Sequence, residues 1–167
     1  MKARKYIFGI ALIGLIGSSC TDTWDEHYAQ DTSKVNNTEI SVVNATITDY
    51  LAQEPSLSDM YQLFNKTGMV EQLLEKEQMY TILAVESGIA AGDDPIYTAQ
   101  TYISDASISP SNLEDGQRIL MWSGKYLNIS TTSPETRAVA GVRFNNANVT
   151  QVIKLTNGYL YLLDQAV

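Results

Sequence analysis

The chain has 167 residues, a length typical of one domain, and it carries 19 acidic against 11 basic residues, for a net charge of −8. A surface of that sign repels phosphate groups, which excludes nucleic acids as partners and argues against charge-driven docking on anionic lipids. Cys20 is the only cysteine in the sequence. No disulfide can therefore form within the chain, and the core must be held by packing alone.

Residues 1–20 have the pattern of a bacterial lipoprotein signal. Three basic residues open the chain, an apolar run follows at 6–16, and small residues at 17–19 lead to Cys20. The run is about half of the 20 residues that a membrane-spanning helix needs. We therefore predict export, cleavage before Cys20 and lipidation of its thiol, which would anchor the protein to the outer membrane at the cell surface. The alternative is an ordinary signal-peptidase site with an incidental thiol at Cys20.

Residues 21–39 are predicted to form a polar tether between the lipid and a folded domain, because they show no sustained apolar period. His27, the only histidine, falls in this tether. Neither a Ser-His-Asp triad nor a multi-histidine zinc site can therefore be built within the domain. Trp24 has two open interpretations, local packing or a role in recognition.

The first part of the domain has a helical pattern. Apolar residues recur on one helical face over 42–51, and Pro55 ends that helix. A second helix is expected to start at Ser56, whose hydroxyl would cap it, with Asp59 completing a capping box. This helix would end at Gly68, in the left-handed conformation that glycine adopts readily.

The middle of the domain mixes helical, strand and loop patterns. A short third helix is predicted at 69–74, and the compact apolar run at 79–85 indicates a buried strand. The stretch 86–95 is rich in glycine and aspartate and is predicted to be a loop. The pattern at 96–103 is ambiguous and is compatible with a short helix.

The second half of the domain is strand-like. Ser123-Gly124 is expected to turn the chain between two β-prone runs, and Asn157-Gly158 is typical of a primed two-residue hairpin turn. A helical first half followed by a sheet-rich second half predicts an α+β domain. The predicted strands are 119–122, 126–129, 139–144, 152–155 and 159–163.

Taken in order, four segments of the chain resemble a fasciclin-like domain. They are ITDYLAQEPSLSDMYQLFNKTGMVEQLL, MYTILAVES, LEDGQRILMWSGKYLNIS and FNNANVTQVIKLTNGYLYLLDQAV. These are similar to the family's opening helices, its first signature, its central hairpin, and its second signature with an asparagine-glycine turn before a strand that ends in aspartate. The resemblance covers residues 40–167 and implies N-terminal helices packed on a C-terminal β-rich sheet or wedge.

The chain departs from the family's pattern in the first signature, where Leu83, Ala84 and Val85 stand in place of phenylalanine-alanine-proline, and at two further positions. Ile103 follows Tyr102 where the adhesion-associated motif has a histidine, and Tyr161 stands where a histidine is common in the last strand. The resemblance therefore implies the fold more directly than it implies integrin-type adhesion.

The residues around the predicted lipidation site add a second resemblance. Cys20 followed by TDTWDEHY is similar to the fasciclin-like surface lipoproteins of Bacteroidetes, which are often encoded beside glycan-uptake systems. This implies a non-enzymatic adhesion module, held to the membrane through the lipid on Cys20, that binds a protein or glycan partner. The alternative function is a structural accessory subunit of an outer-membrane glycan-uptake complex.

Carboxylates are the only catalytic candidates left in the domain. Asp93 and Asp94 could hold a calcium ion or serve a glycosidase, but they lack EF-hand spacing and fit a solvated acidic turn better. Glu114 and Asp115 are most simply turn residues. The sequence has no phosphate-binding loop and no dinucleotide fingerprint. We therefore predict no enzymatic activity, no cofactor and no metal site.

Recognition is expected on exposed loops, because loops on a rigid scaffold commonly carry binding residues. The loop 86–95 and the segment that follows it are the predicted binding surface. Its candidate residues are Asp93, Asp94, Tyr97 and Tyr102.

Overall fold

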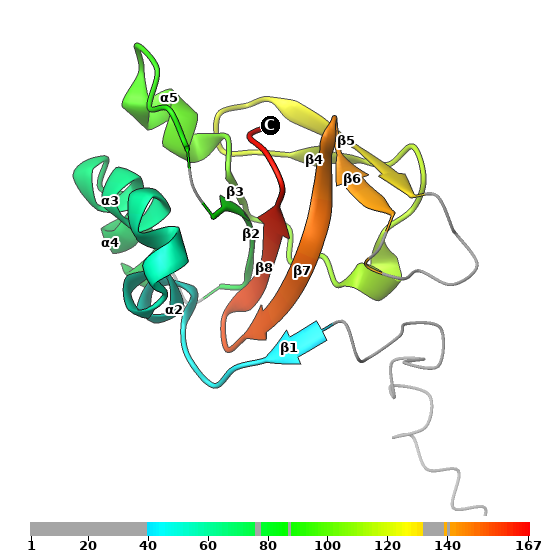
Figure 1. The fold of residues 1–167 in the computed structure, drawn as a ribbon, viewed down its shortest axis with the longest axis horizontal. Coiled ribbons are helices and arrows are strands. Elements are labelled where there is room, and N and C mark those ends of the chain that lie inside the picture. The colour runs from blue at the N-terminus through cyan, green and yellow to red at the C-terminus, as the bar shows by residue number, and fades with distance from the viewer. Residues whose placement is uncertain (1–39, 76–77, 87, 132–138, 140) are drawn as a thin grey trace, which may run out of the picture. The chain divides into compact units, whose positions relative to one another are not determined.

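The computed structural model describes residues 40–75, 78–86, 88–131, 139 and 141–167. The predicted signal, the lipidation site Cys20 and the tether that contains His27 lie outside the described residues. The described part is a mixed α+β structure in which helices lie beside a nearly closed sheet, as Figure 1 shows. The predicted α+β class is therefore confirmed.

The sheet has eight strands in the order β3-β2-β8-β7-β6-β5-β4, and β1 pairs with β7 outside this path. The β1–β7 and β2–β8 pairs are parallel, whereas all the other pairs are antiparallel. The strands are β1 Ile40–Val42, β2 Tyr80–Val85, β3 Ile103–Ser104, β4 Arg118–Leu120, β5 Tyr126–Thr131, β6 Val142–Phe144, β7 Ala147–Leu155 and β8 Gly158–Leu163.

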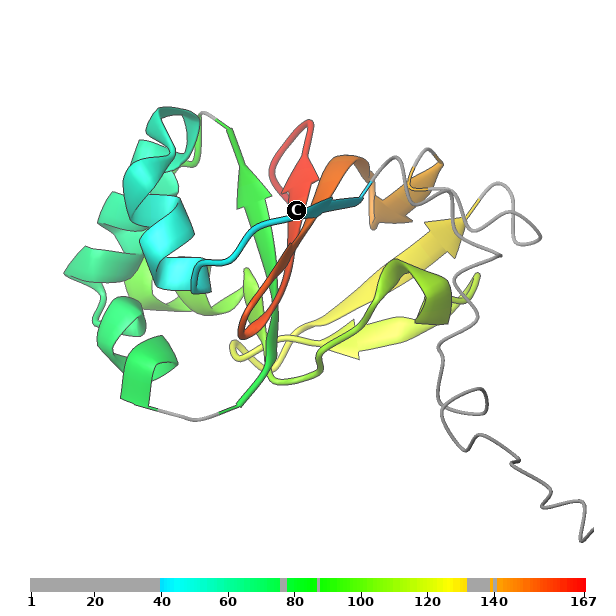
Figure 2. The same ribbon diagram turned by 90° about the horizontal axis from the view of Figure 1, so that it is seen from below.

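The two ends of the strand path approach each other just beyond β4. The N–H of Trp122 donates to the carbonyl of Ile103 over 2.8 Å, and the Ser104 hydroxyl donates to the carbonyl of Leu120 over 2.7 Å. These bonds join β3 to the chain that leaves β4. Figure 2 shows the helices beyond β2 on one side and the β4–β5 hairpin on the other.

The three predicted N-terminal helices are confirmed, and the ambiguous segment after the acidic loop also forms a helix. Gly68 has φ 74° after α3, as its predicted role in ending that helix requires. The helices are α2 Ile47–Gln53, α3 Ser58–Lys66, α4 Met69–Glu75 and α5 Pro95–Gln100, with short 3-10 turns η3 Pro55–Leu57 and η4 Pro110–Asn112.

The predicted capping box at Ser56 is wrong. Pro55 opens the 3-10 turn η3, and the Ser56 hydroxyl donates to Glu54 Oε1 over 3.3 Å instead of capping a helix. A side-chain N-cap does form one helix earlier, at Thr46. The N–H of Asp49 donates to Thr46 Oγ1 over 3.2 Å, and that hydroxyl donates back to the Asp49 carboxylate over 2.7 Å.

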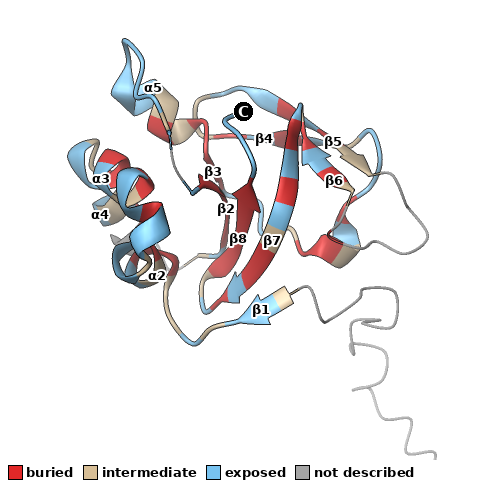
Figure 3. Ribbon diagram, in the orientation of Figure 1, coloured by how far each residue is buried: buried red, intermediate tan, exposed pale blue. Residues whose placement is uncertain are grey.

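The core contains buried residues of the helices and of every strand from β2 to β8. Every residue of β2 and β8 is buried, whereas burial alternates along much of β7, as Figure 3 shows. Such continuous burial is typical of strands that are covered on both faces. Residues from α2 and α3 pack on one side, and the rings of Phe144 and Tyr161 meet edge to face at 5.3 Å between centroids.

The predicted hairpin near the C-terminus is confirmed, but its turn is not of the predicted kind. Leu155 pairs with Gly158, so Thr156 and Asn157 form the turn and Gly158 begins β8 with φ 145°. Among the described non-glycine residues, only Asn145 has a positive φ, so Asn157 does not adopt the primed conformation. Asn157 instead accepts the N–H of Ile47 on its side chain over 2.8 Å.

Candidate functional site

The predicted binding residues do not all reach the surface. Asp93, Asp94 and Tyr97 are exposed, but the side chain of Tyr102 is only 3% exposed. The prediction that Tyr102 lies on an exposed binding surface is therefore wrong. The reason is that Tyr102 leads directly into β3 and its carbonyl accepts the N–H of Leu83, which places the ring in the core. Burial raises the pKa of the Tyr102 hydroxyl, and a hydrogen bond with the Val167 backbone partly opposes this.

The acidic pair in the loop before α5 has a structural role. Asp94 is the N-cap of α5, and its carboxylate accepts the N–H of Tyr97 over 3.0 Å. Asp93 lies beside it, exposed to solvent. Across the described ranges, no group of three or more histidine, cysteine, aspartate or glutamate side chains is placed to hold a metal ion.

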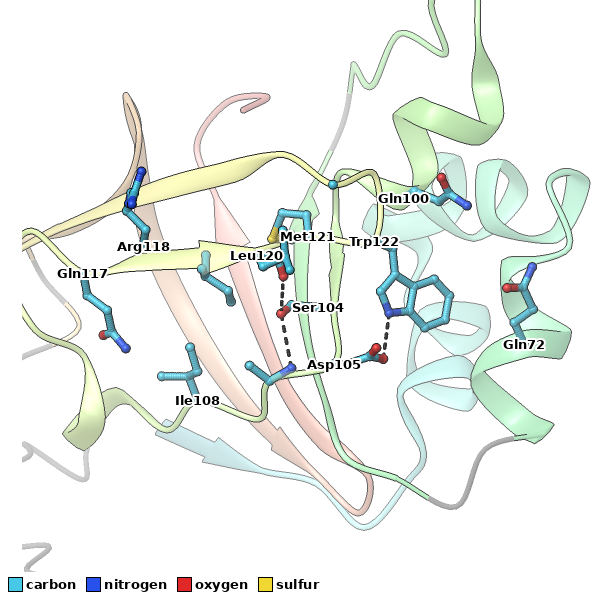
Figure 4. A pocket seen from close by; sticks show the side chains of 13 residues that line it. Gln72, Gln100, Ser104, Asp105, Ile108, Gln117, Arg118, Leu120, Met121 and Trp122 are labelled. Atoms are coloured by element: carbon cyan, nitrogen blue, oxygen red, sulfur yellow. Dashed lines mark hydrogen bonds between the residues drawn. The ribbon is translucent and has the colours of Figure 1, made fainter.

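A groove of about 770 Å³ lies elsewhere, between β4 and the extended segment that follows β3. Its volume falls within the range of roughly 300–1,000 Å³ that is typical of small-molecule sites. Figure 4 shows Gln72, Gln100 and Trp122 at one end of the groove and Gln117 and Arg118 at the other. α4 supplies Gln72 and the last residue of α5 is Gln100, so both helices contribute to this groove along with β4 and the segment after β3.

The indole of Trp122 is held in one orientation. Its Nε1–H donates to Asp105 Oδ1 over 2.7 Å, and the ring meets Tyr80 edge on, with 5.9 Å between centroids and 80° between planes. Gln78 also donates to Asp105 Oδ1, over 2.6 Å. The carboxylate of Asp105 therefore serves as a shared acceptor that fixes the ring.

The wall of the groove at residues 105–108 is fixed by the buried strands behind it. The Thr81 hydroxyl donates to the carbonyl of Ala106 over 2.5 Å and accepts the N–H of Ile108 over 2.9 Å. The Tyr161 hydroxyl donates to the carbonyl of Ile108 over 2.7 Å. Burial raises the pKa of Tyr161 well above its ordinary value, so this hydroxyl remains a donor at physiological pH.

The outer face of the β4–β5 hairpin continues the groove. Leu120 lies opposite Tyr126 in the strand register, and these side chains are 49% and 53% exposed. The guanidinium carbon of Arg118 lies 5.1 Å from the centre of the Tyr126 ring, as in a cation–π contact. Exposed apolar side chains next to a groove commonly mark a binding surface.

Tyr80 lies behind Trp122 and is fully buried. Its hydroxyl has no hydrogen-bond partner among the residues whose positions are described. Burial raises the pKa of this hydroxyl, and the negative charge of Asp105 raises it further.

Replacing Tyr80 with phenylalanine is expected to leave the free energy of unfolding unchanged or to raise it by about 1 kcal/mol, because the hydroxyl makes no compensating bond with the protein. Tyr161→Phe is the matched control. It removes a donor from the carbonyl of Ile108 and should lower stability by about 1–3 kcal/mol. Chemical denaturation of both variants measures the difference. If Tyr80→Phe lowers the free energy of unfolding as much as Tyr161→Phe does, the expectation is contradicted.

The groove was not predicted from the sequence. Gln72, Gln100 and Asp105 belong to segments far apart in the chain, and no local pattern links them. Trp122 offered the one usable signal, since it is a large aromatic residue at the end of a β-prone run and directly before a turn. Such a position brings an aromatic ring to the rim of a sheet, where ligands are commonly bound.

Comparison with known proteins finds no matching family model and no matching curated protein. Within the described ranges, no helix is both long and apolar enough to span a membrane.

Proposed function

We propose that this chain is an exported lipoprotein, anchored through Cys20, whose fasciclin-like domain at 40–167 binds a partner without catalysing a reaction. The arrangement of the strands supports the family assignment. The segment MYTILAVES supplies β2, and the last resembling segment supplies β7 and β8. β2 pairs in parallel with β8 along the whole strand, so the two signature segments lie side by side at the centre of the sheet.

The groove beside Trp122 is the observation that carries the binding function. Its aromatic ring is fixed by Asp105 and Tyr80, and its wall at residues 105–108 is fixed by Thr81 and Tyr161. A site held in this way loses little conformational entropy when a partner binds. A protein or a glycan of the cell surface or the medium is the partner that a membrane-anchored module can reach.

The charges around the groove favour binding over catalysis. Asp105 is the one carboxylate among its described lining residues. Glycoside hydrolysis needs two carboxyl groups about 5–10 Å apart, and Asp105 is already engaged by Gln78 and Trp122. The acids of the predicted surface, Asp93 and Asp94, belong to the loop before α5 and do not line the groove.

Product analysis tests the non-enzymatic part of this proposal. The lipidated protein, extracted intact in mild detergent, is incubated with a panel of bacterial, plant and host polysaccharides, and the products are separated by chromatography. We expect no hydrolysis above the level of a mock extract. Turnover that disappears in Asp105→Asn, or in Asp93→Asn or Asp94→Asn, would overturn the proposal and support a carboxylate glycosidase.

Crosslinking in intact cells tests the binding part. A photoreactive residue at position 120, which lines the groove, should capture a partner that the same residue at position 59 on the exposed face of α3 does not. Capture of a transporter in fixed stoichiometry would instead favour the accessory subunit of an uptake complex. Equal labelling from both positions would contradict binding at the groove.

A further inference from the structure

We propose that Asn157 is a deamidation site, which is reactive in the unfolded chain and is closed when the domain folds. Asn157 precedes Gly158 and is the only asparagine in the sequence that is followed by glycine. The inference is carried by the contacts of the turn that joins β7 to β8. It is independent of the groove and of the proposed binding function.

Deamidation at such a pair is an intramolecular reaction. The backbone nitrogen of Gly158 loses its proton and attacks the side-chain amide carbon of Asn157, the bond from that carbon to the amide nitrogen breaks, and ammonia leaves. Water then opens the cyclic imide at either of its carbonyls, which gives aspartate or isoaspartate. Glycine favours the attack because it has no Cβ to shield its nitrogen and because its backbone is less restricted than that of other residues. In the unfolded chain, residue 157 is therefore expected to be the most reactive asparagine.

In the folded domain, the side chain of Asn157 is held by the start of α2. Its Oδ1 accepts the N–H of Ile47 over 2.8 Å. Ile47 is fully buried, so this donor is fixed in the core of the domain. The bond restricts the side-chain rotation that would bring the amide carbon to the next backbone nitrogen.

The attacking nitrogen is held as well. The carbonyl of Asn157 accepts the N–H of Tyr80 over 2.9 Å, which fixes the peptide bond between residues 157 and 158 against β2. Because backbone groups alternate along a paired strand, those of Gly158 face β7, where Leu155 is the register partner. Gly158 is also buried. Its N–H is therefore shielded from the base that would remove the proton.

The other residue of the turn is fixed to the same segment of the chain. The N–H and the hydroxyl of Thr156 both donate to the carbonyl of Ala45, each over 3.0 Å. The contacts of Thr156 and Asn157 with residues 45–47 must therefore break together when the turn opens. Such joint opening is rarer than the fraying of a loop that is held by a single bond.

Isoaspartate at position 157 would not fit this turn. Its main chain passes through the former side-chain carbons and is longer by a methylene, which displaces β8 relative to β2. A Cβ built on Gly158 already lies 2.8 Å from the Tyr80 nitrogen, so the two strands have no room to shift there. Aspartate keeps the ordinary main chain, and its carboxylate can accept the same N–H of Ile47. Of the two products, only the chain with aspartate is therefore expected to fold.

Peptide mapping by mass spectrometry tests this inference on the intact protein. The folded protein and the same protein unfolded in guanidinium chloride are incubated in parallel at mildly alkaline pH, and conversion of each asparagine is followed over time. We expect residue 157 to convert at least about thirtyfold more slowly in the folded protein, because several hydrogen bonds must open before it reacts. A peptide of residues 154–159, incubated in both buffers, corrects for any effect of the denaturant on the reaction itself.

Two variants at residue 47 test the contact with α2. Ile47→Pro removes the N–H that Asn157 accepts, whereas Ile47→Ala keeps it, and both variants shorten the same buried side chain. Proline is tolerated at the first residue of a helix, and Thr46 before it has φ −74° and ψ 162°, the extended conformation that a residue preceding proline adopts. In the folded state, residue 157 should convert about threefold to tenfold faster in Ile47→Pro than in Ile47→Ala.

The inference is wrong if residue 157 converts as fast in the folded protein as in the unfolded protein, or if other asparagines of the unfolded chain convert faster. Equal rates in the two folded variants would overturn the role of the bond to Ile47. If neither variant folds, the comparison of folded and unfolded parent protein decides the matter.

Refolding tests the fate of the products. After incubation in denaturant and dilution, folded and unfolded chains are separated by size-exclusion chromatography and mapped. Isoaspartate should be confined to the chains that stay unfolded, whereas aspartate should be present in the folded fraction. Isoaspartate and aspartate in equal proportion among folded chains would show that the turn tolerates the longer main chain, contrary to the inference.

Discussion

Gly158→Ala is expected to destabilise the domain by more than about 3 kcal/mol, enough to leave a large part of the protein unfolded. A Cβ on Gly158 would lie 2.8 Å from the nitrogen and 2.9 Å from the carbonyl carbon of Tyr80, and closer still to its carbonyl oxygen. Tyr80 is the parallel partner of Gly158 in the β2–β8 pair. The overlap is therefore with backbone at the centre of the sheet, which cannot move aside as a flexible side chain would.

Backbone conformation adds to this cost. Gly158 has φ 145°, in a region that residues with a Cβ rarely adopt, and such strain costs about 1–3 kcal/mol. Gly124→Ala is the matched control. Gly124 also has a positive φ, 79°, but a Cβ there would have no neighbour within 4 Å. The Gly124→Ala variant should lose about 1 kcal/mol of stability, which is the cost of the backbone conformation alone.

Urea denaturation followed by circular dichroism compares the two glycine variants. We expect Gly124→Ala to unfold cooperatively at a slightly lower urea concentration than the parent. Gly158→Ala should lack a native baseline or unfold at a much lower concentration. Similar midpoints for both variants would mean that Gly158 does not approach β2 as closely as the structure places it.

Cys20→Ala is expected to move nearly all of the protein from the membrane fraction to the soluble fraction. Each buried methylene of a lipid chain contributes about 0.8 kcal/mol to membrane binding, and stable anchoring takes more than one chain. The chain's net charge of −8 does not favour attraction to anionic lipids in place of the lipid anchor. The thiol of Cys20 is the only one in the sequence, so no other cysteine can take its place.

Metabolic labelling with a radioactive fatty acid, combined with membrane fractionation, measures this effect. Label should be present in the parent protein and absent from Cys20→Ala. Trp24→Ala, four positions along the chain, serves as the control and should remain labelled and membrane-bound. Label that persists in Cys20→Ala would refute lipidation at this residue.

Helices and buried strands of the domain were predictable because their signals are local. The faces of α2 and α3 repeat at helical spacing, and β2 and β8 are unbroken apolar runs. Gly68 ends α3 as expected because a left-handed residue after a helix needs no distant partner. Ser123-Gly124 likewise turns the chain, since the bond from Gly124 N–H to the Met121 carbonyl is made within the turn.

One incorrect prediction has a local cause, and the others depend on distant contacts. Ser56 has the residue type of an N-cap, but Pro55 starts a 3-10 turn before it, and the true helix start falls later. Asn157-Gly158 looks like a primed turn, yet Gly158 is needed where the chain passes β2, and Asn157 binds the start of α2. β1 was missed because three residues carry little pattern and their partner is β7.

The candidate site was harder to predict than the fold for the same reason. Tyrosine is common at binding surfaces, and only the position of β3 places Tyr102 in the core. Asp105 and Trp122 are joined by a hydrogen bond across 17 positions of sequence, and Thr81 fixes Ala106 across 25. Local periodicity contains no information about these contacts, which the closure of the sheet creates.

The pairing of β2 with β8 also determines when this domain can fold as the chain is synthesised. β8 spans Gly158–Leu163, so the strand that completes the centre of the sheet is synthesised after every other strand of the described sheet. β1, at the start of the domain, likewise cannot pair until β7 has been synthesised. Contacts of such long sequence separation form slowly, because the chain between them must first be closed into a loop. The domain therefore cannot complete its sheet until the C-terminal hairpin has been synthesised.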